Sequence, residues 1–201
     1  MSIFEDIEIA LQGNKRTLFG IIGEPGAGKS TLVEEIKAKF PTNELAVLPM
    51  DGFHLSNKVL IENGIRHFKG APQTFDSRGF VALLNRVRTV VDQNIYIPVF
   101  HREIEESIAN ESVITPDVKV VIVEGNYLLY PDLGWGGVQE LLDSSYFINI
   151  SQEVRLERLI ARHEKYGKTP EEAREWSLGS DEANAKLIRS TKGLATNIIE
   201  L

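Results

Sequence analysis

The sequence predicts a three-layer α/β fold with a mainly parallel, five-stranded sheet between layers of helices. Short apolar runs alternate with amphipathic segments along the 201 residues, and this alternation is typical of a parallel sheet covered on both faces. A glycine-rich turn over residues 23–28 joins the first apolar run to the first amphipathic segment. No repeat or Pro/Gly-rich linker divides the chain, so we expect residues 1–201 to form one domain.

The five strands of the predicted sheet are assigned to apolar runs. They span residues 17–22, 45–48, 117–123, 146–150 and 196–201. The third run is apolar enough to be buried on both faces. A further short strand is predicted over residues 95–97.

Three segments between these runs are predicted to be helical. The first follows the glycine turn, because apolar residues recur there on one face: Leu32, Val33, Ile36 and Phe40. We expect Pro41 to end this helix. A second helix is predicted over residues 77–91, with Asp76 as its N-cap. Thr169, Pro170 and Glu172 form a capping-box pattern that starts a late helix.

The composition excludes several classes of protein. Lys and Arg number 22 against 29 Asp and Glu, a net charge of −7, which argues against a general nucleic-acid binder. The absence of Cys excludes disulfides, thiolate metal sites and a cysteine nucleophile, and it fits a reducing, cytoplasmic location. Apolar runs such as residues 120–123 are far shorter than the roughly 20 residues that span a bilayer. We therefore expect neither a nucleic-acid nor a membrane partner.

The glycine-rich turn matches the phosphate-binding pattern G-x-x-x-x-G-K-[ST]. Its backbone N–H groups and the start of the following helix would hold phosphates, Lys29 would reach the β and γ phosphates, and Ser30 would coordinate Mg²⁺. The predicted nucleotide-binding residues are Gly23, Glu24, Pro25, Gly26, Ala27, Gly28, Lys29, Ser30 and Thr31. The alternative is a turn that binds nothing. The flanking apolar strand and amphipathic helix, which a true P-loop requires, disfavour it.

A P-loop is shared by GTPases, motor ATPases and kinases. The two Asn-Lys pairs, in residues 14–17 and 57–60, lack the acid of the guanine-reading N-K-x-D loop. His101-Arg102-Glu103 superficially resembles the catalytic loop of protein kinases. However, Glu replaces the required Asp and no DFG follows. The protein-kinase interpretation is rejected.

Two acidic residues follow apolar runs at predicted strand ends. Asp51 comes after residues 45–50, and Glu124 after residues 120–123. Ligands of open parallel sheets bind beyond the carboxyl ends of the strands, where the P-loop also lies. One carboxylate would accept a hydroxyl proton and the other would hold Mg²⁺ or its water. For either residue alone, a solvated loop carboxylate or a helix cap is the alternative.

An arginine stripe follows the fourth predicted strand. Arg155, Arg158 and Arg162 are spaced i, i+3 and i+7, so they share one helix face. Such a stripe near a phosphate site can clamp a nucleotide and stabilise charge on the transferred group. The alternative is a solvated basic face paired with neighbouring glutamates.

Beyond these elements, the chain resembles a kinase family. Residues 50–55 (Met-Asp-Gly-Phe-His-Leu) and 69–76 (Lys-Gly-Ala-Pro-Gln-Thr-Phe-Asp) resemble segments of bacterial type I pantothenate kinase. Residues 98–100 and 124–129 resemble elements shared by the wider phosphoribulokinase, uridine kinase and pantothenate kinase group. The pattern is most similar to an uncharacterised branch associated with nucleosides or fructose transport. The resemblance covers most of the chain.

This resemblance implies a kinase that uses ATP and Mg²⁺ to phosphorylate a hydroxyl of a small metabolite such as a sugar, pantothenate or a nucleoside. It implies that Asp51 is the base, that Glu124 lies near the metal, and that the arginine helix belongs to a helical lid over ATP, at about residues 153–180. The implied catalytic residues are Lys29, Asp51, Glu124, Arg158 and Arg162. The chain is shorter than type I pantothenate kinases, and residues 101–103 match neither the pantothenate nor the uridine kinase pattern.

We expect the acceptor pocket in the loops after Asp51, around residues 64–76 and after Phe100. Its polar candidates are His54, Arg66, Lys69, His101, Arg102 and Tyr127. Arg66, Lys69 or Arg102 would be the natural partner of a phosphate or carboxylate. His54 and His101 could instead be surface imidazoles, and Tyr127 could be part of the core. Trp135 is interpreted as packing, while Asn184 and Thr191 are placed beside the adenine.

Two other functions stay open. One is a regulatory nucleotide-binding module whose ATP state controls a partner protein. The other is a nucleoside monophosphate kinase that binds its acceptor phosphate through Arg66, Lys69 and Arg102. In the main hypothesis the partner is a small-molecule substrate, and a homodimer is compatible with the sequence.

Overall fold

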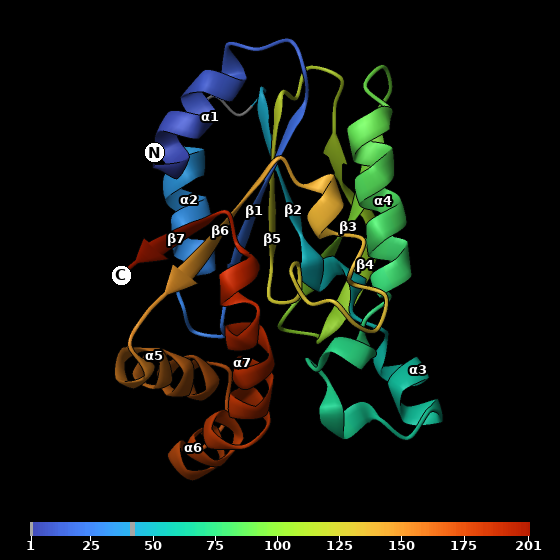
Figure 1. Ribbon diagram of the computed structural model, residues 1–201. Coiled ribbons are helices and arrows are strands. Elements are labelled where there is room, and N and C mark those ends of the chain that lie inside the picture. The colour runs from blue at the N-terminus through green and yellow to red at the C-terminus, as the bar shows by residue number, and fades with distance from the viewer. Residues whose placement is uncertain (1, 41–42) are drawn as a thin grey trace.

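The protein is built around a five-stranded, wholly parallel sheet (Figure 1). The structure is a computed structural model that describes residues 2–40 and 43–201. In spatial order the strands are β2 (Leu45–Pro49), β5 (Val120–Gly125), β1 (Thr17–Gly23), β6 (Ser144–Asn149) and β7 (Asn197–Glu200). The predicted α/β fold and its five-stranded sheet are confirmed, with strand limits that differ by a few residues.

Helices cover both faces of this sheet. Helices α1 (Ile3–Leu11) and α2 (Lys29–Lys39) pack on one face, and α4 (Ser77–Thr89) packs on the other (Figure 1). Successive side chains of a strand point to opposite faces. Thus Leu18 and Ile22 of β1 join the core beneath α4, whereas Phe19 and Ile21 join the core beneath α1 and α2. This double burial explains why the central strands are apolar throughout.

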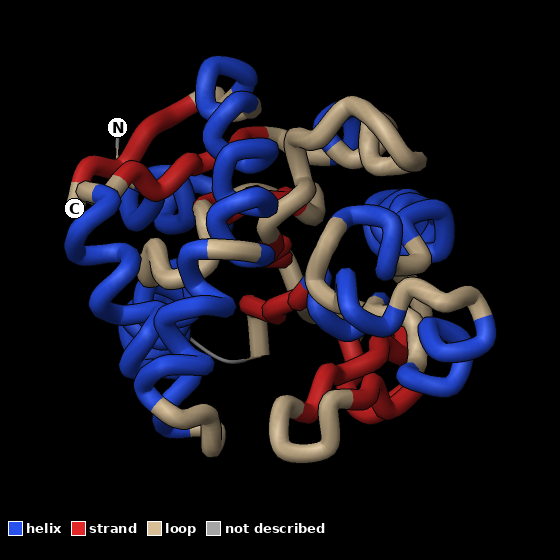
Figure 2. Tube along the Cα trace, turned by 90° about the horizontal axis from the view of Figure 1, so that it is seen from below, coloured by secondary structure: helices blue, strands red, loops and turns tan. Residues whose placement is uncertain are grey.

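The remaining elements extend to the carboxyl ends of the strands, and the hairpin among them also packs on the core beneath α4 through Ile95, Ile97 and Ile114. Strands β3 (Ile95–His101) and β4 (Glu106–Ile114) form a separate antiparallel hairpin, and α3 (Asn57–Glu62) lies beside it. Helices α5 (Gln152–Lys165), α6 (Pro170–Leu178) and α7 (Ser180–Ser190), which we call the lid helices, lie on the opposite side. Seen from below, the lid helices are on the left and the hairpin with α3 is on the right (Figure 2). The open end of the sheet lies between them.

Several elements differ from the predictions. Helix α1 was not predicted, although Ser2 and Glu5 form a complete capping box at its start. The strand predicted over residues 95–97 continues to His101, and its partner β4 was not predicted. The helix predicted to reach residue 91 ends at Thr89. The predicted helix stop at Pro41 lies outside the described residues. Across residues 2–40 and 43–201, no helix combines the length and apolarity needed to span a bilayer.

Candidate active site

The P-loop joins β1 to α2 and is shaped by two glycines. Gly26 and Gly28 have positive φ angles of 86° and 99°, a region that side chains other than glycine rarely adopt. A Cβ on Gly26 would also lie 2.7 Å from the carbonyl oxygen of Arg155. Glycine at position 26 therefore lets the loop turn and lets α5 approach it closely.

Lys29 is buried at the start of α2. Its Nζ donates hydrogen bonds to the carbonyl oxygens of Gly23 at 2.9 Å and Glu24 at 3.3 Å. It also lies 3.9 Å from Oε1 of Glu124. Burial lowers the pKa of Lys29, and the carboxylates of Glu124 and Asp51 oppose that shift. The ammonium group is thus held in place in a dry environment where an added phosphate would interact with it strongly.

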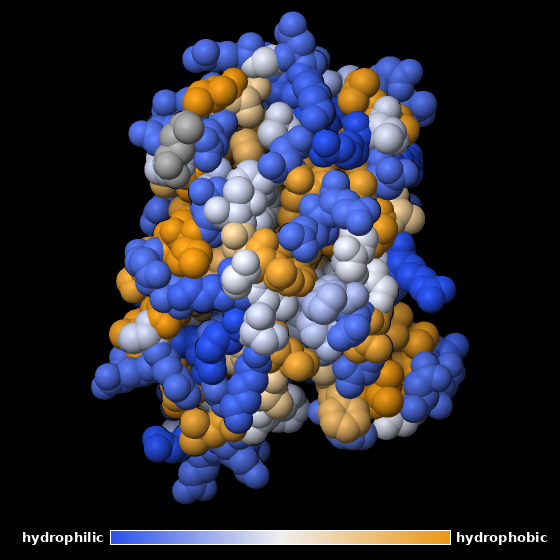
Figure 3. All heavy atoms as spheres, viewed as in Figure 1, coloured by the Kyte–Doolittle hydropathy of each residue, from blue (hydrophilic) through white to orange (hydrophobic). Residues whose placement is uncertain are grey.

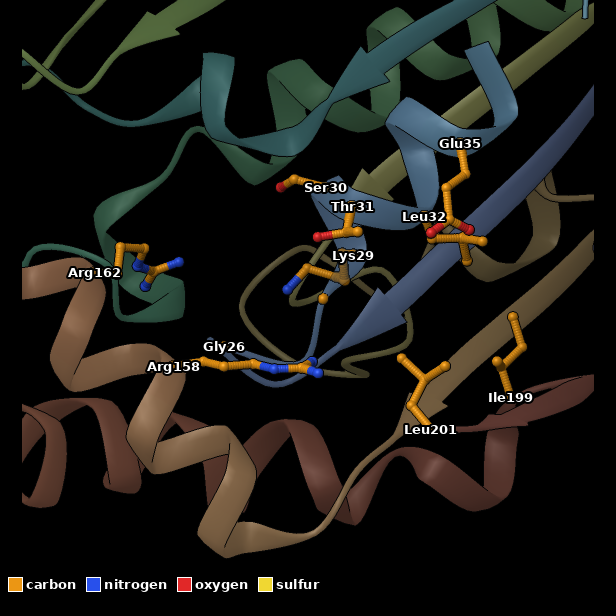
Figure 4. Close-up of a pocket in the computed structure, with 11 residues that line it drawn as sticks. Gly26, Lys29, Ser30, Thr31, Leu32, Glu35, Arg158, Arg162, Ile199 and Leu201 are labelled. Atoms are coloured by element: carbon orange, nitrogen blue, oxygen red, sulfur yellow. The ribbon is translucent and has the colours of Figure 1, made fainter. Parts of the chain in front are cut away.

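A cavity of 780 Å³ opens in front of the P-loop. It is large enough for a nucleotide, because ligand pockets generally measure about 300–1,000 Å³. In Figure 4, Arg158 and Arg162 come from α5 on one side, while Lys29, Ser30 and Thr31 lie at the start of α2. The complete lining is Gly26, Gly28, Lys29, Ser30, Thr31, Leu32, Glu35, Arg158, Arg162, Ile199 and Leu201. One side is thus cationic and polar, and β7 with the end of the chain supplies an apolar wall.

The two predicted strand-end carboxylates lie together at the end of the sheet. Asp51 is in a short 3₁₀ turn, Met50–Phe53, that directly follows β2, and Glu124 is in β5, paired in register with Pro49. The turn packs tightly on β3, since a Cβ on Gly52 would lie 2.5 Å from the carbonyl oxygen of Pro98. This close approach fixes the position of Asp51.

Glu124 and Ser30 could hold a divalent cation. Burial raises the pKa of Glu124, and the Lys29 charge only partly offsets this effect, so a cation beside the carboxylate would favour its charged form. Ser30 lines the same space as Glu124. The described residues contain no cluster of three or more Asp, Glu, His or Cys placed to hold a metal. This sparse oxygen-donor set fits Mg²⁺, which binds through one or two protein ligands plus phosphates and water.

A second cavity, of 470 Å³, lies between the lid helices and the β3–β4 hairpin. In Figure 3 the lower edge of the molecule is indented between the lid helices and the part that contains α3. Predicted residues in its lining are Lys29, Ser30, Asp51, His54, Arg66, Lys69, Arg102, Glu124 and Arg162. Lys29, Ser30 and Arg162 line both cavities. The two spaces therefore meet where the P-loop holds its lysine.

Phe100 forms a platform in this second cavity. The His54 ring lies 4.4 Å from it, centroid to centroid, and Lys69 Nζ and Arg102 Cζ lie 5.4 and 6.0 Å from the ring centre. Arg102 Nη2 donates to Oδ2 of Asp51 at 2.8 Å. Burial lowers the pKa of His54, whose Nδ1 lies 2.8 Å from the carbonyl oxygen of Asp51.

Comparison with known proteins assigns the family. A model of the phosphoribulokinase / uridine kinase family matches residues 18–200. The chain belongs to this family. It is 31% identical over 188 residues to a putative uridine kinase of Schizosaccharomyces pombe, covering 89% of this chain and 80% of that protein. It is 33% identical over 191 residues to the uncharacterized protein YggC of Escherichia coli, covering 93% of this chain and 78% of that protein.

A solved structure is similar over nearly the whole length of both chains. The crystal structure of a putative fructose transport system kinase from Silicibacter sp. TM1040 has a TM-score of 0.87 and 32% identity, and the match covers 99% of each chain. The predicted resemblance to the phosphoribulokinase, uridine kinase and pantothenate kinase group is confirmed. The chain is a kinase of the phosphoribulokinase / uridine kinase family.

In this kinase, some residues of the P-loop contact other parts of the protein and do not line the nucleotide cavity. The Glu24 carboxylate is turned to the lid helices, where Arg189 Nε and Nη2 donate to it at 2.9 and 2.7 Å and Arg155 Nε lies 3.1 Å away. Ala27 is fully buried, and neither it nor Gly23 lines the ATP-sized cavity. Pro25 lines the second cavity instead. Residues 23–31 remain the predicted nucleotide-binding loop, with the difference that Glu24 directs its carboxylate to the lid helices.

Two predicted acceptor residues lie outside the second cavity. His101 contacts Glu103 and Glu111 on the outer side of the hairpin, at 2.8 and 2.7 Å. Its neighbours Phe100 and Arg102 line the cavity, because successive residues of a strand point to opposite sides. Tyr127 is fully buried, and its hydroxyl donates to the carbonyl oxygen of Gly70 at 2.7 Å. It is a core residue.

The structure also shows where the remaining predicted residues lie, most of them in or next to the lid helices. Arg155, the first arginine of the stripe, is buried and paired with Glu24 and Glu182. Asn184 lines the second cavity and not the ATP-sized one, and Thr191 is buried with its hydroxyl on the Ile188 carbonyl oxygen. Trp135 is packed in the core, as interpreted. Residues of the second cavity that the sequence analysis missed include His163, Tyr166, Lys168, Trp176 and Asp181.

Proposed function

We propose that this kinase transfers the γ-phosphoryl group of ATP to a hydroxyl of a small metabolite. The observation that carries the proposal is the junction of the two cavities at Lys29, Ser30 and Arg162. The nucleotide cavity supplies the phosphate-binding loop, and the second cavity supplies the Asp51 carboxylate. Phosphoryl transfer depends mainly on positioning and electrostatics, so such a junction accounts for much of the catalysis.

Each residue at the junction has a proposed role. Asp51 accepts the proton of the acceptor hydroxyl, and the hydroxyl oxygen forms a bond to the γ-phosphorus as the bond to the β–γ bridging oxygen breaks. Lys29 neutralises charge on the β and γ phosphates, while Arg158 and Arg162 stabilise charge on the transferred group. Ser30 and Glu124 would hold Mg²⁺. When bound, Mg²⁺ neutralises phosphate charge and orients the leaving group.

The volume of the second cavity limits the acceptor to a small molecule. At 470 Å³ it fits a sugar, pantothenate or a nucleoside, and its mixture of aromatic and charged groups would bind such polar metabolites. Two similar proteins carry names that point to this class, a uridine kinase and a fructose transport system kinase. Asp51 counts against the regulatory module weighed above, because a switch needs no base for an acceptor.

The test is an assay of ADP release with ATP, Mg²⁺ and a panel of acceptors. The panel contains pantothenate, uridine, cytidine, fructose and other sugars, with their monophosphates and mononucleotides. We expect one acceptor class to stimulate ADP release well above the acceptor-free rate. Stimulation by mononucleotides alone would favour the nucleoside monophosphate kinase. Tight ATP binding with no stimulation by any acceptor would contradict the proposal and favour the regulatory module.

A further inference from the structure

The proposed base is paired with an arginine. Arg102 donates to Asp51 at 2.8 Å, and the exposed fractions of the two side chains are 42% and 25%. Partly exposed ion pairs of this kind contribute only about 0–1 kcal/mol. Another anion could therefore displace Asp51 from Arg102 at little cost. While the pair persists, however, the Asp51 oxygen that accepts from Arg102 is engaged.

The other carboxylates of the second cavity already have partners. Glu124 lies 3.9 Å from Lys29, Glu105 lies 3.7 Å from Lys69, Asp181 lies 2.7 Å from His163, and Glu103 lies 2.8 Å from His101. In contrast, Arg66 forms no ion pair or side-chain hydrogen bond with any residue in 2–40 or 43–201. Arg66 nevertheless lines the cavity. The acceptor side of the cavity thus holds a guanidinium without a counter-charge.

Arg66, Lys69 and Arg102 line the cavity from two segments. Arg66 and Lys69 belong to the turn after α3, Arg102 follows β3, and both Lys69 and Arg102 lie over Phe100. Burial lowers the pKa of Lys69, the Glu105 carboxylate opposes that shift, and the Arg66 charge adds to it, so Arg66 lies close enough to Lys69 for the two cations to repel each other. A bound anion would relieve this repulsion.

We propose that the acceptor carries a carboxylate or phosphate group that binds Arg102 and Arg66, and that this group draws Arg102 away from Asp51. The inference rests on the proposed function, because Asp51 is taken as its base. Arginine suits the role, since its planar guanidinium pairs with carboxylate and phosphate oxygens through two parallel hydrogen bonds.

The exchange links binding to chemistry. The guanidinium of Arg102 passes from the Asp51 carboxylate to the acceptor anion, so the number of ion pairs is conserved. The released Asp51 oxygen then accepts the proton of the acceptor hydroxyl. The acceptor oxygen gains the phosphoryl group, ADP keeps the bridging oxygen, and the proton leaves from Asp51 to water. A neutral analogue would leave Arg102 on Asp51 and would react slowly even where it binds.

A binding measurement tests the anion site without requiring turnover. The full chain is saturated with AMP-PNP and Mg²⁺, and inorganic phosphate or acetate is titrated by calorimetry. We expect dissociation constants on the order of millimolar for at least one anion, weakened about tenfold or more in Arg102→Ala and Arg66→Ala. Arg86→Ala is the matched control, because Arg86 is an exposed arginine of α4 outside both cavities. It should bind as the wild type does.

A turnover measurement then uses matched acceptors that differ in one charged group. The pairs are pantothenate with panthenol, glycerate with glycerol, and fructose 1-phosphate with fructose. We expect the active pair to show kcat/KM at least about 100-fold higher for its anionic member, a difference of about 2.7 kcal/mol. Arg102→Ala should reduce this preference to less than about tenfold. It should also raise the rate with the neutral member, because Asp51 is no longer engaged. A carboxylate and a phosphate acceptor are distinguished by which pair responds.

The outcomes separate this inference from the proposed function. Equal use of neutral and anionic members would overturn the anionic acceptor while leaving the kinase proposal intact. No anion binding by the wild type, or unchanged binding in Arg102→Ala and Arg66→Ala, would also overturn it. Anion binding that depends on both arginines, with no acceptor-stimulated ADP release, would support the anion site and contradict the proposed function. Arg102→Lys, which keeps the charge, should retain part of the preference if the loss in Arg102→Ala is electrostatic.

Discussion

At the residue scale, the chemistry depends on buried polar groups held by a few close contacts. His54 packs between Phe75 and Phe100, with ring centroids 4.0 and 4.4 Å away. Burial lowers its pKa, and the Asp51 carboxylate only partly opposes that shift. The folded state therefore binds a proton at His54 less readily than the unfolded chain does.

This difference predicts a pH dependence of stability. Above the unfolded pKa of about 6.5, the His54 contribution is fully present. As the pH falls, the unfolded chain takes up the proton first, and stability is lost. The free energy of unfolding, measured between pH 5 and 8, should fall less steeply in His54→Gln than in the wild type. His67→Gln, at an exposed histidine, is the control and should keep the wild-type slope. Parallel curves for all three proteins would show that His54 is not responsible.

Site residues were predicted correctly where a short stretch of sequence determines their position. The P-loop pattern located Lys29 and Ser30, because the spacing alone specifies their geometry. Strand-end logic brought Asp51 and Glu124 into the same cavity. His101 was placed wrongly because the predicted strand stopped at residue 97. The alternation of side chains along the strand was therefore not extended to residues 100–102. There it directs Phe100 and Arg102 into the cavity and His101 away from it.

At the scale of elements, a buried ion network ties the P-loop to the lid helices. Glu24 lies between Arg155 of α5 and Arg189 of α7, and Glu182 of α7 also pairs with Arg155. The side chains of Arg155 and Glu24 are only 1% and 10% exposed. Removing one partner of a buried pair leaves an uncompensated charge, which costs more than the pair itself contributes.

Glu24→Gln should therefore destabilise the protein by about 3–5 kcal/mol and weaken ATP binding, because the P-loop loses its anchor on the lid helices. The matched control is Glu8→Gln, which breaks an exposed pair with Lys39 at 2.8 Å and should cost no more than about 1 kcal/mol. Urea unfolding and ATP titration measure the two effects. Equal small losses in both variants would show that the network carries no special weight.

Helices and strands were predicted correctly where the sequence carries a clear apolar periodicity or a full capping motif. The Thr169 capping box marked the start of α6 correctly. Strand β4 was missed because most of its residues are exposed, so no buried face imposes an apolar alternation. The start of α1 carried a usable signal, since Ser2 and Glu5 form its capping box.

At the scale of the whole molecule, the second cavity is formed jointly by the lid helices and the hairpin side. The chain contains two tryptophans, and they report on different regions. Trp176 of α6 lines the second cavity beneath Lys168, whose Nζ lies 4.3 Å from the ring centre, whereas Trp135 is fully buried. Closure of the lid helices over ligands should therefore change the surroundings of Trp176 alone.

We expect AMP-PNP, Mg²⁺ and an acceptor together to shift tryptophan emission to shorter wavelength, because closure removes water from Trp176. Trp176→Phe should abolish the shift. Emission from Trp135 alone, in that variant, should not respond. A ligand-induced shift that persists in Trp176→Phe would place the change elsewhere in the fold.

The overall fold could be predicted because alternating strands and helices with a P-loop restrict the topology to a narrow class. The side of the second cavity that the lid helices form could not, since its residues come from α5, α6 and α7, which are distant in sequence from Asp51 and the hairpin. No local pattern marks residues such as Lys168 or Trp176 as neighbours of Asp51. Only the packing of the lid helices opposite the hairpin reveals them.

The central claim is that Asp51 is the base for phosphoryl transfer at the junction of the two cavities. The most direct test compares acceptor-stimulated ADP release by Asp51→Asn and the wild type, with AMP-PNP binding measured in parallel. If Asp51 is the base, Asp51→Asn should lower kcat by about 10²–10⁴-fold, the usual contribution of a general base, with nucleotide affinity retained. Asp132→Asn, at an exposed carboxylate without an ion pair in the described part of the chain, should behave as the wild type. Acceptor-stimulated turnover near the wild-type rate in Asp51→Asn would contradict the account.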